Sequence, residues 1–477
     1  MLGGLLNLSR RRFWEEPWVQ HMAVVLAILA LSGILGLRPS PVTLLIIVGA
    51  FAALFLVRSP LLGLPVLLVG SIVFPFTIGT GTQTAINITI LLIPALLGLW
   101  IADMFRHGRA RLVPSQTTLP IVLLAISAVI SFIAGDLPWD PFARTAPITA
   151  QVGGLATFVL SAGVFLLVGN QVTDLRWLKL LVALFLAIGA LYMIGRINPI
   201  LGRFAGTINA NGSDGSMFWV WLVALASGQL FFNQKLSPVV RAALGLLIAL
   251  TVGIGWFLAR TWTSGYLPPM IAIGTILWLR SPRLGLLAAG LAGIAIILTG
   301  HTNLLNSLIE LKSYSILTRD VARDILITQV LPLSPIIGLG PANYYWYAPL
   351  YPILGWYVTF NSHNNYVDIL MQTGVVGLVS FLWVMAAIGL LGWRLRKCFK
   401  DDFAQGYVYA CLGGLAGTMV SCWLADWLIP FVYNVGLRGF RASVLAWLFM
   451  GGLVSLEQIA RKSTNIIPND SSGQEAL

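Results

Sequence analysis

Long runs of apolar residues recur along nearly the whole chain, and short stretches between them hold most of the polar and charged residues. Clear examples are "MAVVLAILALSGILGL" at 22–37, "LVALFLAIGALYMIG" at 181–195 and "VVGLVSFLWVMAAIGLLGW" at 375–393. Each run approaches the roughly 20 residues that a helix needs to cross the hydrocarbon core of a bilayer. The pattern therefore predicts an all-α fold, a polytopic transmembrane helical bundle.

The hydropathy pattern places about 12–14 spans and one long outer loop at about 300–362. The predicted helices are 20–37, 41–57, 60–78, 86–104, 118–134, 150–169, 177–195, 216–232, 241–258, 264–279, 284–299, 364–392, 405–428 and 437–456. We divide the chain into N-terminal helices (1–199), a central segment (200–395) that includes the outer loop, C-terminal helices (396–456) and a disordered cytoplasmic tail (457–477).

Composition agrees with a membrane protein, because 58% of the residues are hydrophobic and only 10% are charged. The net charge of +12 could suggest nucleic acid as a partner, but the basic residues punctuate the apolar runs and form no single patch. Basic clusters at 10–12, 106–111, 280–283 and 393–397 fall on one side of the predicted threading. The positive-inside rule makes that side cytoplasmic, together with both termini.

The segment "FNSHNNYVDILMQTGVVGLVSF" at 360–381 places a histidine and three asparagines at the start of a predicted helix. At about 100° per residue, Gly374 and Gly377 return close to the face of His363, so glycine notches could admit another helix. We expect Asn361 or Ser362 to cap the helix and His363 to lie in its first turn, where the helix dipole favours a neutral imidazole. Such a residue is either a catalytic base or only part of a helix cap near the headgroups.

The spacing of His363-Asn364, nine residues, then Gly374-Val-Val-Gly377 resembles the signature of the O-antigen ligase and polymerase family of bacterial membrane glycosyltransferases. Two further segments are similar to motifs of that family, "RFAGTINAN" at 203–211 and "LTRDVARDILITQVLPLSPIIGLGPANYYW" at 317–346. The resemblance covers residues 200–395. Ala210 stands where the family usually has proline, and Arg260 lies upstream of Ser264-Gly265 where the family usually has a Ser-Arg pair.

The resemblance implies a metal-independent, inverting transfer without a cofactor, from a polyprenyl (undecaprenyl) diphosphate-linked glycan to a glycan or lipid acceptor. It implies a multi-pass protein of the inner, cytoplasmic membrane with its active site facing the periplasm or cell exterior. His363 is then the general base. Arginine binds phosphate oxygens bidentately, which suits Arg203, Arg260, Arg319 and Arg323 to the diphosphate. The remaining predicted site residues are Asn211 and Asn364 for substrate and Gly338, Gly340, Gly374 and Gly377 for structure.

Several alternatives stay open at this point. Arg319 and Arg323 alternate with aspartates and could form a solvated charged turn, and the aromatic residues at 344–356 could stack on sugars or form a membrane-interface belt. Asp136 and Asp140 could hold a divalent ion in a metal-dependent glycosyltransferase that uses a lipid monophosphate sugar. A lipid or glycan transporter would need mid-membrane charges and paired broken helices, which the sequence does not suggest. Ligase and polymerase need the same donor clamp and base.

Overall fold

The computed structural model describes residues 59–74, 77–79, 85–108, 112–209, 215–259, 262–298, 314–399 and 402–465. The chain divides into two compact units, Met1–Pro60 and Leu61–Leu477. Only the second unit is described below. The predicted helices at 20–37 and 41–57 lie outside the described residues.

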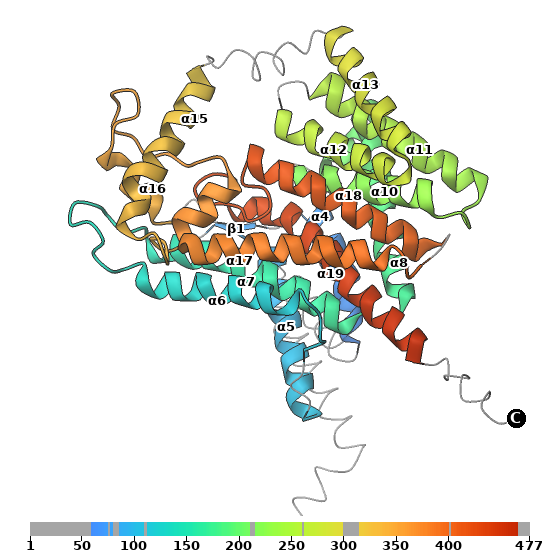
Figure 1. Cartoon of the computed structure of the whole chain (residues 1–477), viewed down its shortest axis with the longest axis horizontal. Helices are drawn as coiled ribbons and strands as arrows, with labels where there is room; N and C mark the ends of the chain where they lie inside the picture. The colour runs from blue at the N-terminus through green and yellow to red at the C-terminus, as the bar shows by residue number, and fades with distance from the viewer. Residues whose placement is uncertain are drawn as a thin grey trace, which may run out of the picture. The chain divides into compact units, whose positions relative to one another are not determined.

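The second unit is an all-α bundle, as predicted, and its helices run from α4 to α19 (Figure 1). They are α4 (Gly63–Val73), α5 (Ile88–Arg106), α6 (Thr118–Ala134), α7 (Ile148–Gln171), α8 (Leu175–Ile197), α9 (Pro199–Asn209), α10 (Ser216–Phe232), α11 (Pro238–Gly253), α12 (Thr263–Arg280), α13 (Pro282–Leu298), α15 (Tyr314–Ile325), α16 (Tyr344–Tyr347), α17 (Asn365–Leu395), α18 (Phe403–Leu424) and α19 (Gly436–Asn465). Short 3₁₀ turns occupy Pro60–Leu62, Leu331–Leu333 and Ala348–Leu350, and π-helical turns occupy Ile254–Leu258 and Leu326–Val330.

Among the described residues, seven helices are long and apolar enough to cross a membrane, counting α11 together with the π-turn that follows it. Four shorter apolar helices accompany them, and the protein is therefore a multi-pass membrane protein. Two predicted boundaries were wrong. The helix predicted at 60–78 ends at Val73, and β1 (Thr77–Gly79) pairs antiparallel with β2 (Ala85–Asn87). The last helix continues nine residues past 456 to Asn465, into the predicted tail.

Polar residues in the connecting stretches start several helices by capping them. Asn87 accepts hydrogen bonds from the backbone N–H groups of Thr89 and Ile90, and Asp402 does the same for Ala404 and Gln405. The first N–H groups of a helix have no partner within it, so a side-chain acceptor at this position favours the start of the helix. The sequence thus encodes where α5 and α18 begin.

Helices from all parts of the unit pack around α19, whose most apolar 18-residue window is completely buried. Small residues allow the close approaches. A Cβ atom on Gly228 of α10 would lie 2.8 Å from the backbone nitrogen of Ala410 in α18, which leaves no room for a side chain. Because α19 packs against α7 and α17 against α6, the predicted divisions at 199 and 395 are divisions of the sequence and do not separate structural units.

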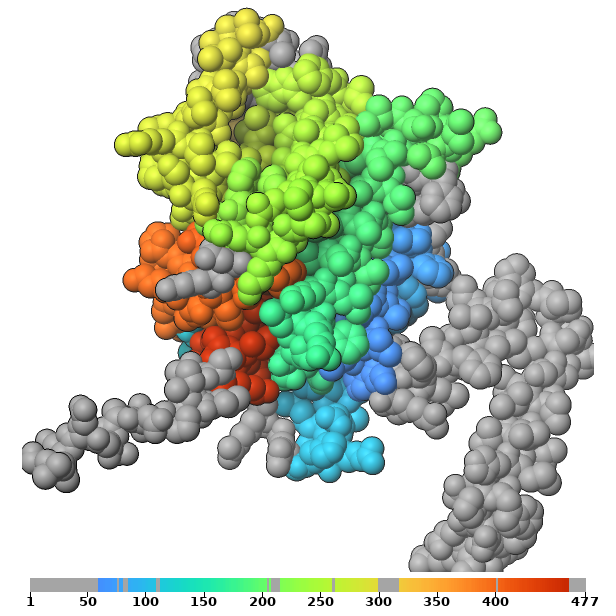
Figure 2. Space-filling model, turned by 90° about the vertical axis from the view of Figure 1, so that its right-hand side faces the viewer, coloured from blue at the N-terminus to red at the C-terminus, as the bar shows by residue number. Residues whose placement is uncertain are grey.

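Successive spanning helices alternate direction, so hydrogen bonds identify two ends of the bundle. One end joins Ala146 to Asn343, Ser131 to Ile337, Ser216 to Ser421 and Ser264 to Trp427. It includes α16, on the left of Figure 1. The other end joins Gln116 to Ala387, Gln229 to Phe403 and Pro114 to Arg461. Figure 2 looks onto this second end, where α19, in red, emerges between the orange helices and the green α8. The residues discussed next lie at the first end.

Candidate functional site

The turn that carries His363 differs from the prediction. The N-cap of α17 is Asn364, which accepts hydrogen bonds from the N–H groups of Tyr366 and Val367, so the helix begins at Asn365. His363 therefore precedes the helix and is not in its first turn. Its φ is +49°, a left-handed conformation, and its N–H donates to Oδ1 of Asn361 at 3.2 Å. This tight turn holds the half-buried imidazole at the N-terminal end of α17.

A break within α17 explains part of the glycine pattern. Gly374 has φ +67° and ψ −170°, so the helix is interrupted there. The segment 335–340, which begins as a turn, inserts at the break. Its carbonyls accept from the N–H groups of Val375 and Val376 at 2.9 and 3.2 Å, and its N–H groups at 339 and 340 donate to the carbonyls of Met371 and Gln372 at 2.9 and 3.1 Å. The inserted segment thus replaces the hydrogen bonds that the broken helix loses.

Glycine is required on both sides of this insertion. A Cβ atom on Gly374 would lie 2.6 Å from the nitrogen of Gly338, and one on Gly338 would lie 2.6 Å from the carbonyl oxygen of Gln372. Gly338 and Gly340 also have positive φ, +73° and +91°. The prediction that Gly374 admits a neighbouring helix was wrong, because it admits the segment 335–340. Gly377 does face α6, where its Cβ would lie 3.2 Å from Oγ of Ser127.

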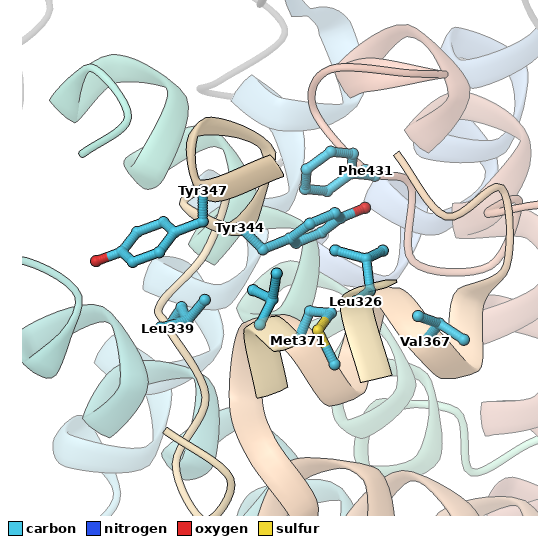
Figure 3. Close-up of a cluster of buried hydrophobic side chains, with 8 residues drawn as sticks. Leu326, Leu339, Tyr344, Tyr347, Val367, Met371 and Phe431 are labelled. Atoms are coloured by element: carbon cyan, nitrogen blue, oxygen red, sulfur yellow. The ribbon is translucent and has the colours of Figure 1, made fainter. Parts of the chain in front are cut away.

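A cluster of buried side chains ties the insertion to the turn of His363 (Figure 3). Leu326, Tyr344 and Met371 belong to it, and Phe431 stacks on Tyr344 with ring centroids 4.6 Å apart. The hydroxyl of Tyr344 donates to the buried carboxylate of Asp368 and accepts from the N–H of Ser362 at 3.3 Å. Burial and Asp368 raise the pKa of this phenol well above its ordinary value.

The aromatic residues at 344–356 thus include both buried and exposed side chains. Tyr344 and Tyr347 are part of the core, which neither of the predicted roles anticipated. Trp356 is exposed and is one of the residues that line a cavity beside His363.

That cavity has a volume of about 560 Å³ and is open to the surface at the first end of the bundle. α15 and the segment 353–363 form its walls. The side chains with polar or aromatic groups in its lining include Thr318, Arg319, Tyr345, Trp356, Asn361 and His363. An imidazole and a guanidinium therefore share one pocket of a size that holds a sugar or phosphate group.

Burial, together with the positive charges of Arg319 and Arg323, lowers the pKa of His363 from 6.5 to about 4, and burial is the largest of these causes. The imidazole is therefore neutral at physiological pH. Of the two arginines, Arg323 is the one that forms an ion pair with a described residue, Asp320, at 3.3 Å. Arg323 lies on the helix α15 and not in a turn, and its ion pair is partly buried, while Arg319 lines the cavity.

One residue that the sequence did not suggest, Asn434, contacts the imidazole, and a second, Asp426, contacts Asn434. Nδ2 of Asn434 lies 3.2 Å from Nδ1 of His363 and also donates to Oδ1 of Asp426. Oδ2 of Asp426 accepts from the N–H of Phe431 at 2.9 Å. Burial raises the pKa of Asp426 to about 6. Asp368, on the first turn of α17, accepts from Oγ of Ser362 at 2.6 Å.

The other predicted site residues are placed differently. Arg203 is exposed on α9 at the same end of the bundle and does not line the cavity. Asn211 and Arg260 lie outside the described residues. Asn364 is 1% exposed, caps α17 and donates to the carbonyl of Trp423 at 3.0 Å, so its place in the structure is that of a cap and its substrate contact stays a prediction.

The two aspartates of the metal-dependent alternative are engaged separately. Oδ1 of Asp136 accepts from Gln151 at 3.0 Å, and Oδ1 of Asp140 accepts from the N–H of Phe142 at 2.8 Å. Within the described ranges, no three or more His, Cys, Asp or Glu side chains are grouped as metal ligands. Comparison with known proteins adds no relative: no protein-family model matches the chain, and no curated protein is significantly similar to it in sequence.

Proposed function

We propose that the protein is a membrane glycosyltransferase of the O-antigen ligase type. It transfers a glycan from a polyprenyl diphosphate carrier to an acceptor hydroxyl. The observation that carries the proposal is that a neutral imidazole, His363, and a cavity-facing guanidinium, Arg319, line one open cavity at one end of an apolar helical bundle. A base and a phosphate-binding cation are the two groups that this reaction needs most.

The chemistry follows from these two groups. The acceptor oxygen attacks the anomeric carbon of the donor, its proton passes to a ring nitrogen of His363, and the bond from the anomeric carbon to the diphosphate oxygen breaks with inversion. The leaving diphosphate gains negative charge. Arg319 offsets it with a planar fork of donors that stays charged beside the membrane. Arg323 adds positive potential behind it. A general base contributes typically about two to four powers of ten in rate.

The charge distribution supports an outward-facing site. At the end opposite His363, the described helix ends and short connections carry most of the basic residues. These are Arg106, Arg176, Lys179, Lys235, Arg241, Arg280, Arg283, Arg394, Arg396, Lys397, Arg461 and Lys462. By the positive-inside rule that end is cytoplasmic, which supports a cavity that faces the periplasm or cell exterior from the inner membrane.

The proposal is tested in a strain from which the gene is deleted. His363→Ala should fail to restore the surface glycan although the protein accumulates in the membrane. His107→Ala is the matched control, because His107 is exposed at the opposite end of the bundle and should restore the glycan fully. Normal complementation by the His363 variant would remove this residue from the mechanism.

The same strain separates the two activities of the family. Free, long lipid-linked chains in the deletion strain indicate a lost ligase, whereas single repeat units indicate a lost polymerase. Purified protein in detergent then tests the reaction itself, since no gradient exists there and a transporter would show no turnover. Transfer that is lost in chelator and restored by manganese would favour the metal-dependent class.

A further inference from the structure

The contacts of the imidazole determine more than its position. Nδ2 of Asn434 lies within hydrogen-bonding distance of both Nδ1 of His363 and Oδ1 of Asp426. An amide nitrogen carries two hydrogens and is only a donor. One side-chain atom thus connects the buried carboxylate to the ring.

The carboxylate of Asp426 determines the orientation of the side-chain amide of Asn434. Both oxygens of Asp426 act as acceptors, Oδ2 from the N–H of Phe431 at 2.9 Å and Oδ1 from Asn434. An ionised carboxylate has no hydrogen to donate, so it cannot bond to the amide oxygen of Asn434 and must face the NH₂ group. The second hydrogen of that NH₂ group then points to His363.

The orientation of the amide in turn fixes the tautomer of the ring. Nδ1 of His363 accepts a hydrogen bond, so this nitrogen carries no proton. A neutral imidazole has one N–H group, which is therefore on Nε2. In this tautomer the nitrogen that is not bonded to Asn434 is a donor and has no lone pair to offer.

We propose that Asp426 and Asn434 are positioning residues that set the tautomer of His363 and hold the resting ring with its proton on Nε2. The tautomer itself does not depend on the proposed function, but its consequence for catalysis rests on that function. To accept a proton from an acceptor hydroxyl through Nε2, the ring must first become the Nδ1–H tautomer. The amide of Asn434 must turn over for this, so that its oxygen accepts from Nδ1–H.

One isosteric substitution makes the prediction sharp. In Asp426→Asn, the new amide keeps an oxygen for the N–H of Phe431 and presents an NH₂ group to Asn434. Asn434 must then turn its oxygen toward residue 426. The same oxygen takes the position that Nδ2 holds beside Nδ1 of His363, and the ring changes to the Nδ1–H tautomer. Removing the carboxylate should therefore produce the tautomer that is competent as a base.

The experiment is ¹⁵N NMR of full-length protein labelled at histidine, at pH 8, where Asp426 is ionised and His363 neutral. The chain has four histidines, and His363→Gln assigns the relevant signals. Nε2 should be the protonated nitrogen in the wild type, and Nδ1 should be the protonated nitrogen in Asp426→Asn. Asp402→Asn, at the cap of α18, is the control and should leave the wild-type tautomer unchanged.

Either a wild-type ring with its proton on Nδ1, or a tautomer that does not reverse in Asp426→Asn, would overturn the inference. Asn434→Ala, which removes the amide altogether, gives a second test and should yield a mixture of both tautomers. These signals do not depend on turnover. A protein with the expected tautomers but no glycan transfer would contradict the proposed function alone. A transferase with the wrong tautomer would contradict only the positioning role.

Discussion

Replacing Gly374 by alanine tests whether the break in α17 holds the site together. Gly374 adopts φ +67° and ψ −170°, a region that is open essentially to glycine alone. Its missing side chain leaves the space in which the segment 335–340 inserts. Four backbone hydrogen bonds between this segment and residues 371–376 depend on the fit. Gly374→Ala should therefore expel the segment or strain the helix.

The cost has two parts. The backbone conformation costs an alanine about 1–3 kcal/mol. Overpacking adds a similar amount, about 1–3 kcal/mol, because the Cβ atom would lie 2.6 Å from the nitrogen of Gly338 and the backbone would have to move. The sum, about 2–6 kcal/mol, is a large part of the roughly 5–15 kcal/mol by which proteins are stable.

The assay is thermal unfolding in detergent at a fixed scan rate, combined with hydrogen exchange of the amides at 375 and 376. Gly374→Ala should lower the apparent melting temperature and speed exchange at both amides. Gly389→Ala is the control in the same helix, because its Cβ would lie 3.3 Å from one flexible leucine methyl group. Wild-type melting and exchange in Gly374→Ala would refute the account of the insertion.

Three further predictions follow from the same region. Because burial and nearby arginines lower the pKa of His363 to about 4, the acid limb of the pH profile of kcat/KM should lie near pH 4. Arg319→Gln should move this limb up toward pH 6.5, and an unmoved limb would contradict the electrostatic effect of Arg319 on His363. Asn364→Ala removes the cap of α17 and should cost about 1 kcal/mol in thermal unfolding with KM unchanged. Tyr344→Phe removes a donor to buried Asp368 and should destabilise the protein by about 1–3 kcal/mol in the same assay, whereas unchanged unfolding would show that this carboxylate does not need the bond.

The sequence predicted the spanning helices well because lipid demands the same apolar composition everywhere. The prediction failed where other forces act. The segment after Val73 is apolar enough to continue a helix, yet it forms a short hairpin with 85–87. In the outer segment, α15 is too polar for hydropathy to detect and is stabilised by packing of the π-turn at Leu326–Val330 against the core.

Candidate site residues were predictable only where chemistry is local. His363 stood out by its position before a helix, and Arg319 by its spacing in the outer segment. Asn434 did not, because it lies 71 residues from the ring that it contacts and nothing around it in the sequence marks it. The polar residue at 364 drew a functional prediction, but a helix start that needs a capping acceptor explains it fully.

The glycines at 338 and 374 connect the two sides of the cavity through the protein backbone. Arg319 lies on α15, which continues through the π-turn into the segment 335–340. That segment is bonded to residues 371–376 of α17, about two to three turns after Asn364, the cap that follows His363 directly. Imidazole and guanidinium are therefore held relative to each other by main-chain hydrogen bonds and a buried apolar cluster, not by contact between their own side chains. A side chain at Gly338 or Gly374 would displace this backbone and move the guanidinium away from the imidazole.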